Sequence, residues 1–289
     1  MTVLLKAGEV VSKLPPHLTY ADGTLSIKGG LALSDPLLIV LDEMPSEPLS
    51  VDVGSGTEVK IIIEIRVEHA TGQSIELNLI ARRNARVKHL LVGEINGTAT
   101  LLQNIDGYRD ASLDLVDAFA SENLTARVHV GLLEEGAEAK LRALAVSSET
   151  QSQTIDVLIT HSAKNTFGDM TNIGIANKKG RIVLNGVEKI EKGMKNANAF
   201  QTLKGIILSD EARVEVNPIL LIDEYDVKAG HGATIGKIDE DALYYLRSRG
   251  LTVREAERLI INGFLNPVIN DIDDTAIRER FVELVNQRI

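Results

Sequence analysis

A long succession of short apolar segments limits the folds that this chain can adopt more than any other feature. From about residue 51 to residue 237, apolar side chains tend to recur at every second position, which is the pattern of β-strands that bury one face. The spacing between segments is on the order of a dozen residues, as expected for an all-β architecture. The clearest segments are 59–67, 73–81, 85–92, 98–105, 111–119, 125–132 and 137–146.

A weak motif also recurs at strand starts. Alanine is followed by a charged residue, by valine or alanine, and by a second polar residue, and a polar turn residue such as Asn84 or Glu211 usually precedes it. Repeats of this kind indicate a stack in which each coil buries the apolar face of its neighbour. The copies are Ala85-Arg86-Val87-Lys88, Ala126-Arg127-Val128-His129, Ala137-Glu138-Ala139-Lys140 and Ala212-Arg213-Val214-Glu215.

Alternation alone does not distinguish such a stack from a β-sandwich. Three dipeptides of the hairpin type, Asn96-Gly97, Asp106-Gly107 and Asn185-Gly186, keep the sandwich open. The strands are nevertheless short and similar, and hairpin signals are few for so many strands. These two features favour a parallel β-helix.

Composition excludes several kinds of function. The formal net charge is -10, which disfavours nucleic acid or an anionic membrane surface as a partner. With 0 cysteines, the chain has no disulfides, no thiolate metal ligands and no thiol nucleophiles. No signal peptide is recognisable and no apolar run approaches the ~20 residues of a membrane span, so we expect a cytoplasmic protein. Phosphate-binding loops and the hydrolase elbow motif are also absent, so any ATP site must belong to a partner.

The periodicity changes from two to about 3.6 after the last strand, which marks a switch to helices. Asp239 is expected to cap a helix that ends at Arg249, and Thr252 with Glu255 has the signature of a capping box for the next one. The apolar face predicted for that second helix is Val253, Ala256, Leu259 or Ile260, and Phe264. We therefore divide the chain into an N-terminal strand and turn segment (1–50), a β-helix core (51–237) and a small C-terminal helical segment (238–289).

The same C-terminal region carries a family resemblance. It contains Asn217-Pro218, Asp226-Val227-Lys228, His231-Gly232-Ala233-Thr234 and the run Tyr244-Tyr245-Leu246-Arg247-Ser248-Arg249-Gly250. Upstream, His161, Thr166, Gly168, Gly186, the run 196–201 and Leu208-Ser209-Asp210 fit the same pattern. Roughly the C-terminal half of the chain resembles the SufB/SufD family, the scaffold components of the Suf iron–sulfur cluster assembly system, and is more similar to SufD.

This resemblance implies a right-handed parallel β-helix with a helical C-terminal segment. Enteric-type members begin with a large helical domain, for which this chain has no room. The resemblance also implies a non-catalytic scaffold subunit that acts with an ABC-type ATPase, SufC, and with a SufB-like subunit or a second copy of itself.

Two other functions remain open from the residues. A regulatory homologue could bind the ATPase without any role in clusters, and the missing cysteines fit that alternative. A carbohydrate-active β-helix enzyme would need acids on one stacked face. Asp114, Asp117, Glu134 and Glu135 are available, but we interpret them as outward residues of alternating strands.

His231 is the main candidate ligand, because imidazole binds metals and glycines on both sides leave its backbone bare. In the related SufD proteins the matching histidine is implicated in cluster assembly, usually with a cysteine where this chain has Ala229. The cysteine of SufB is also missing, with Leu203 near its position. Since cluster irons are mostly held by cysteine, we expect at most a transient cluster at a subunit interface and none bound stably by this chain alone.

The other candidate residues are weaker. Glu224 and Asp226 could supply carboxylates beside His231, although such acids are more often part of a solvated turn. Tyr244, Tyr245 and Leu246 are candidates for the surface that binds the ATPase. The remaining strand histidines, His69, His89, His129 and His161, have no metal-site spacing, and we expect them at the surface or at an interface.

Overall fold

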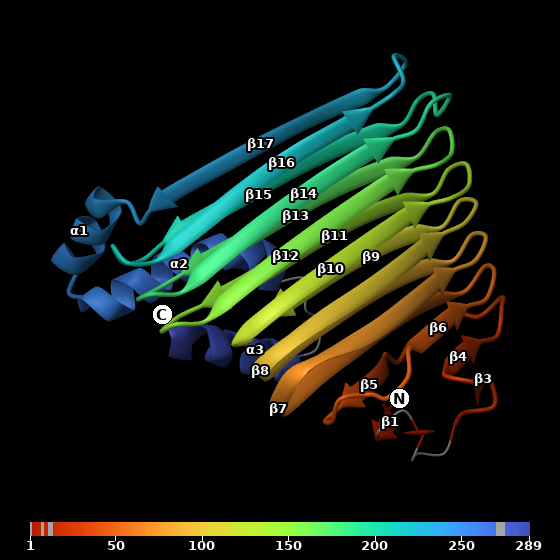
Figure 1. The fold of residues 1–289 in the computed structure, drawn as a ribbon, viewed down its shortest axis with the longest axis horizontal. Coiled ribbons are helices and arrows are strands. Elements are labelled where there is room, and N and C mark those ends of the chain that lie inside the picture. Colours follow the sequence, from red (N-terminus) through yellow and green to blue (C-terminus); the bar gives the residue numbers. More distant parts are fainter. Residues whose placement is uncertain (1, 7–8, 11–13, 270–274) are drawn as a thin grey trace.

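The computed structural model describes residues 2–6, 9–10, 14–269 and 275–289. Its strands wind into the predicted right-handed parallel β-helix, with helices at the C-terminal end (Figure 1). Successive strands belong alternately to two parallel sheets that face each other across the interior, so each coil contributes one strand to each sheet. Two long strands, β7 (Glu58–Ala81) and β8 (Arg86–Gly107), serve both sheets. Their shared register shifts between Val67 and Gln73, where the chain crosses from one sheet to the other.

The first sheet contains the opening halves of β7 and β8 together with β5 (Leu37–Leu41), β9 (Ser112–Phe119), β11 (Glu138–Ser147), β13 (Phe167–Ala176), β15 (Asn198–Ile207) and β17 (Lys228–Lys237). The second contains their closing halves with β4 (Thr24–Ile27), β6 (Leu49–Val53), β10 (Asn123–Leu132), β12 (Ser152–His161), β14 (Arg181–Ile190) and β16 (Arg213–Ile222). At the N-terminal end, β1 (Thr2–Lys6) pairs with β5 and with β2 (Glu9–Val10), and β3 (Leu18–Ala21) forms a hairpin with β4.

The corners between the second and the first sheet explain two copies of the repeated alanine motif, at Ala85 and Ala137, which follow the positive-φ residues Asn84 and Gly136. Asn84, Asp110, Asn165 and Asn196 all have positive φ, a conformation that Asn and Asp tolerate better than most residues. A small or β-branched residue follows each of them and is fully buried at the corner. These buried residues are Ala85, Ala111, Thr166 and Ala197. The motif at Ala126, by contrast, lies inside β10 and marks no corner.

Parallel pairing along both stacks excludes the β-sandwich. The three dipeptides that kept it open form no hairpin among the described strands: Asn96-Gly97 lies within β8, Asp106-Gly107 ends β8, and Asn185-Gly186 lies in the middle of β14. The interior between the two sheets is filled by inward-facing aliphatic side chains. Leu91, Leu115 and Leu141 are examples with 0% exposure.

The helical segment contains α1 (Glu240–Ser248), α2 (Val253–Ile269) and α3 (Thr275–Arg288). The predicted cap and capping box are confirmed: Asp239 accepts the amide of Asp241, and Glu255 accepts the amide of Thr252. Helices α2 and α3 pack on the outer face of the first sheet, behind the sheets in Figure 1. Their contact is made by Ile261, Leu265, Phe281 and Val285 against Ile62, Leu90, Val116, Leu144 and Ile173.

The predicted apolar face of α2 is wrong in part. Ala256 is buried, but Val253, Leu259 and Phe264 are 42%, 52% and 45% exposed. The face that packs on the sheet is rotated and contains Ile261, Leu265 and Ile269, while Ile260, predicted as the alternative to Leu259, is half-buried. A run with apolar residues on more than one side does not define which side meets the core.

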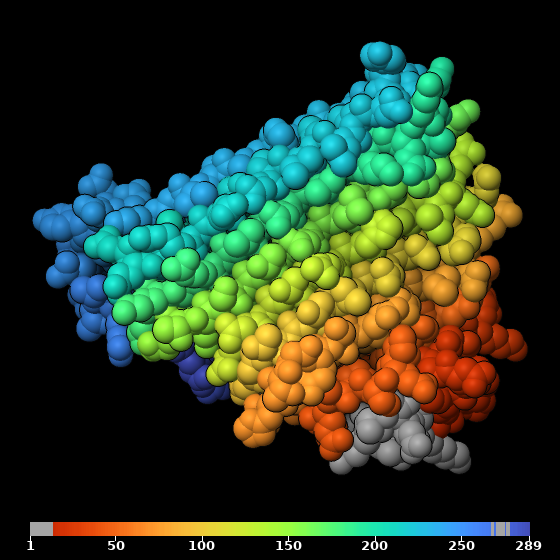
Figure 2. Space-filling view, viewed as in Figure 1, coloured from red at the N-terminus to blue at the C-terminus, as the bar shows by residue number. Residues whose placement is uncertain are grey.

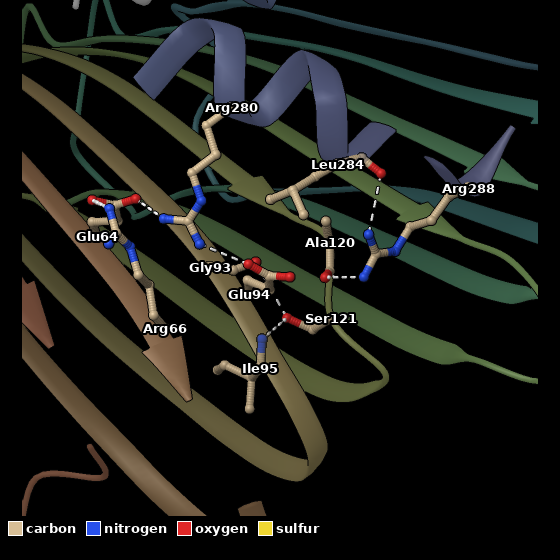
Figure 3. A network of polar contacts seen from close by, with 10 residues as sticks. All are labelled: Glu64, Arg66, Gly93, Glu94, Ile95, Ala120, Ser121, Arg280, Leu284 and Arg288. Carbon is tan, nitrogen blue, oxygen red and sulfur yellow. Dashed lines mark hydrogen bonds and ion pairs between the residues drawn. The ribbon is translucent and has the colours of Figure 1, made fainter. Parts of the chain in front are cut away.

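Polar contacts also fasten α3 to the first coils (Figure 3). Arg280 forms an ion pair with Glu64 and donates a 2.7 Å hydrogen bond to Glu94. Glu64 is only 2% exposed and is also paired with Arg66. Farther along the helix, Arg288 donates to the carbonyl of Ala120 at 2.8 Å. The C-terminal helix is thus bonded to strands that belong to the first half of the chain.

None of the helices described is both long and apolar enough to cross a membrane.

Candidate functional site

The two sheets end at β16 and β17, which together we call the open end of the β-helix. In the described pairings β16 is bonded to β14 and β17 to β15, with no strand on their other sides. In Figure 2 these strands, in cyan to blue, form the upper border of the molecule. An edge of this kind presents unpaired N–H and C=O groups to which another chain can add.

Apolar side chains are exposed here. Ile222 and Ile235 share the inward phase of their buried register partners Ile190 and Gly205, yet with no further coil beside them they are 39% and 47% exposed. The outward-facing Ile219 and Leu221 of β16 are 42% and 51% exposed. An exposed apolar area of this kind, rimmed by polar residues, is typical of a protein interaction site. Both the unpaired backbone and the apolar side chains therefore mark the open end as an association surface.

His231 lies on β17 in this open end. Register pairs it with Gln201 of β15, and its side chain is exposed. A Cβ atom added at Gly232 would meet no heavy atom within 4 Å, so the opposite face of β17 is open as well. The structure thus places His231 where a partner or its cargo could approach closely.

Glu224 and Asp226 lie in the turn between β16 and β17. The Glu224 carboxylate accepts the amides of Tyr225 at 2.8 Å and of Gly193 at 3.0 Å. Hydrogen bonds from the amides of Tyr225 and Asp226 lower the pKa of Glu224. These contacts show that Glu224 fastens the turn.

The structure does not bring these acids together with His231. Asp226 is five residues before His231 along an extended chain, a separation of about 16 Å. No group of three or more potential metal-binding His, Cys, Asp or Glu residues occurs in the part of the chain that the structure describes. Each residue stays a prediction as an individual ligand, and a partner would have to complete any metal site.

The three predicted ATPase-binding residues lie together on α1. Tyr244 is 74% exposed, Tyr245 is 56% exposed and Leu246 is half-buried. No residue of α1 is buried. Tyr244 and Tyr245 make up what we call the helical patch; Leu259 and Phe264 of α2 are exposed as well.

Two of the strand histidines are not at the surface, and that expectation was wrong for them. His89 is 2% and His161 is 0% exposed, whereas His69 and His129 are exposed as expected. Asp117, which we expected to face outward, is also fully buried. The phase of each strand could have revealed this, since His161 shares the inward phase of Ile155 and Ile159.

These inward polar residues form two clusters inside the β-helix. In one cluster, His89 is 2.9 Å from Gln103 and 3.8 Å from Asp117. Burial lowers the pKa of His89 to about 4 and raises the pKa of Asp117 to about 7. The other cluster centres on His161 and Glu188, which are 3.1 Å apart.

Known proteins are similar to this sequence over most of its length. A family model described as the SufBD core domain of the SUF system for FeS cluster assembly matches residues 42–264. Iron–sulfur cluster assembly protein SufD of Bacillus subtilis is 33% identical over 215 residues, which cover 73% of this chain and 49% of that protein. The protein of the same name from Escherichia coli is 24% identical over 308 residues, covering 97% of this chain and 70% of that protein.

A plant protein is also similar. Protein ABCI7, chloroplastic, of Arabidopsis thaliana is 24% identical over 276 residues, which cover 92% of this chain and 56% of that protein. The chain therefore spans about half the length of the Bacillus and Arabidopsis proteins.

Proposed function

Because this chain belongs to the SufBD family of iron–sulfur cluster assembly proteins, we propose that it is a non-catalytic, SufD-like scaffold subunit of a Suf-type complex. It acts in the cytoplasm with a SufC-type ABC ATPase and with a SufB-like subunit or a second copy of itself. The observation that carries this proposal is the open end, where unpaired strand edges and exposed apolar side chains occur together.

The open end is the surface for the SufB-like subunit or second copy. A strand of the partner beside β16 or β17 would extend the sheets and satisfy their free backbone groups, as in β-strand addition. Ile222 and Ile235 would then lose the exposure that distinguishes them from the inward side chains of the inner coils.

An iron–sulfur cluster is the cargo of this complex. The chain itself has 0 cysteines, so the thiolates that hold cluster irons come from the partner. His231 contributes one imidazole from β17, while the exposed Asp226 is too far along the chain to share a metal with it. The cluster is therefore transient and belongs to the interface.

The ATPase binds the helical patch. Tyr244 and Tyr245 expose aromatic rings on a helix that has no fully buried residue. Large aromatic and apolar side chains of this kind are typical anchors of interfaces. Leu246, half-buried, borders the patch.

Two variants, one single and one double, test the two surfaces separately. In co-purification with the ATPase and the SufB-like protein, Ile219→Glu should release the SufB-like protein and retain the ATPase. Tyr244→Ala with Tyr245→Ala should do the reverse. Retention of both partners by both variants would contradict the proposal.

The regulatory alternative is favoured by the missing cysteines and is tested through His231. In the assembled complex, His231→Ala should leave both partners bound but slow the formation of clusters. His69→Ala, at another exposed strand histidine, is the matched control. If His231→Ala forms clusters at the normal rate, the histidine has no ligand role. If the unmodified complex forms none, the regulatory function holds.

A further inference from the structure

Several residues that carry the family resemblance have no place in the proposed interfaces, yet they meet inside the β-helix. His161 ends β12, Thr166 lies in the turn that follows, and Gly168 belongs to β13. Their common neighbour is Glu188 of β14, one coil further on. The side chains of His161 and Glu188 are both 0% exposed. A carboxyl group in such a place must be neutral or well paired.

The hydrogen bonds around His161 determine where its proton lies. The Thr166 hydroxyl donates its hydrogen to the carbonyl of Ala163 at 3.2 Å. With that hydrogen assigned to the carbonyl, the hydroxyl oxygen accepts from the Nδ1 atom of His161, which is 2.8 Å away, and we assign the imidazole hydrogen to Nδ1. In a neutral imidazole the Nε2 atom is then a bare acceptor.

Among the described residues, Glu188 is the hydrogen-bond partner of that bare nitrogen. The Oε2 atom of Glu188 lies 3.1 Å from Nε2, and a carboxylate could not donate to it. We propose that Glu188 is a protonated carboxylic acid that donates to His161, and that this proton fastens β12 to β14 as a pH-sensitive lock on the last coils before the open end.

Gly168 makes the contact possible. A Cβ atom at this position would lie 2.8 Å from Nε2 of His161 and 3.0 Å from Oε2 of Glu188. Any larger residue would therefore push the two groups apart. The requirement for glycine is steric, because a side chain would occupy the space that the hydrogen bond needs.

The electrostatic surroundings support the same assignment. Burial raises the pKa of Glu188 to about 9, with a smaller effect from the nearby carboxylate of Asp169 on β13. Burial lowers the pKa of His161 to about 4. His161 and Asp169 are the titratable groups that face Glu188. Its register partner on β16 is Leu220, and β15 turns Ala199 and Gln201 inward.

The sign of the pH dependence follows from these two shifts. The folded chain keeps the Glu188 proton up to pH about 9, while the unfolded chain releases it near 4.5, so stability falls as pH rises between these values. The His161 shift removes stability as pH falls from 6.5 towards 4. The two effects oppose each other below pH 6.5, and above it only the loss due to Glu188 remains.

Calorimetric unfolding of the full chain between pH 6.5 and pH 9 tests the lock. Glu188→Gln replaces the acid by an uncharged group that still donates to Nε2. We expect the wild-type Tm to decline over this range and the Tm of Glu188→Gln to decline clearly less. Wild-type unfolding at pH 8 should release about one proton more than unfolding of this variant. Gly168→Ala should lower the Tm at every pH.

Asp117→Asn is the matched control. It removes another buried acid, but one with a pKa of about 7, so it should leave the decline between pH 7.5 and pH 9 in place. A decline in Glu188→Gln as steep as in the wild type would overturn the proposal.

Should Glu188→Gln fail to fold, 15N spectra of the wild-type histidine rings decide the question. A neutral His161 with hydrogen on Nδ1 alone supports the proposal. An imidazolium with hydrogen on both nitrogens, or hydrogen on Nε2 alone, overturns it.

Discussion

The middle coils and the open end are built from the same repeat, yet their side chains have opposite surroundings. Ile190 of β14 and Ile222 of β16 are register partners with the same inward phase, but their exposures are 1% and 39%. β14 is bonded on both sides, to β12 and β16, whereas β16 is bonded only to β14. Burial of a side chain in this fold therefore depends on its inward or outward phase and on the presence of the next coil, more than on the local sequence.

Matched isoleucine truncations should show the largest difference between the two regions. Ile190→Ala leaves a cavity in the closed interior and should cost about 2–5 kcal/mol of unfolding free energy. Ile222→Ala truncates a side chain that is 39% exposed and should cost about 1 kcal/mol or less in the isolated chain. Denaturant unfolding of the two variants under identical conditions measures both. Equal costs would mean that the open end is packed, against itself or against a second copy.

A smaller effect is expected where α3 is fastened to the first coils. Arg280→Met removes a partner from Glu64, which is only 2% exposed, and should cost about 1–3 kcal/mol. Lys178→Met, which breaks an ion pair with Glu149 whose side chains are 56% and 65% exposed, should cost at most about 0.5 kcal/mol. The same unfolding assay applies. If the two costs were alike, the contact of α3 would contribute no more than a solvated ion pair.

Replacement of a corner residue by alanine should lower stability by the same amount in both regions. Asn84 precedes the middle coils and Asn196 lies near the open end, and both have positive φ. Replacement of either by alanine should cost about 1 kcal/mol, because the strain of a left-handed conformation is local. Changes in thermal unfolding that differed strongly between the two variants would show that the corners depend on their neighbours.

Much of this fold could be predicted from its strands, and the reasons are local. Alternating apolar residues and the small residue after each turn reflect contacts that every coil repeats, as at Ala85 and Ala111. The caps of α1 and α2 were predictable too, since Asp239 and the Thr252–Glu255 pair act on backbone within three residues.

What the sequence could not supply depends on contacts between distant residues. Arg280 and Glu64 form an ion pair although they are 216 positions apart, and the local sequence around each residue gives no sign of the other. The buried pair His161 and Glu188 is separated by 27 positions and depends on the spacing of one coil. The proposed ligands His231, Glu224 and Asp226 followed from the resemblance and their proximity in sequence, which an extended strand does not turn into proximity in space.

Backbone hydrogen exchange tests directly whether the open end is the association surface, because this surface is formed by the unpaired edges of β16 and β17. In the isolated chain, the amides of β17 should exchange much faster than those of β11, which is bonded on both sides. On assembly with the SufB-like subunit or a second copy, β16 and β17 should become protected while β11 stays unchanged. Assembly that leaves β16 and β17 exchanging as fast as before would contradict the claim that the open end is the association surface.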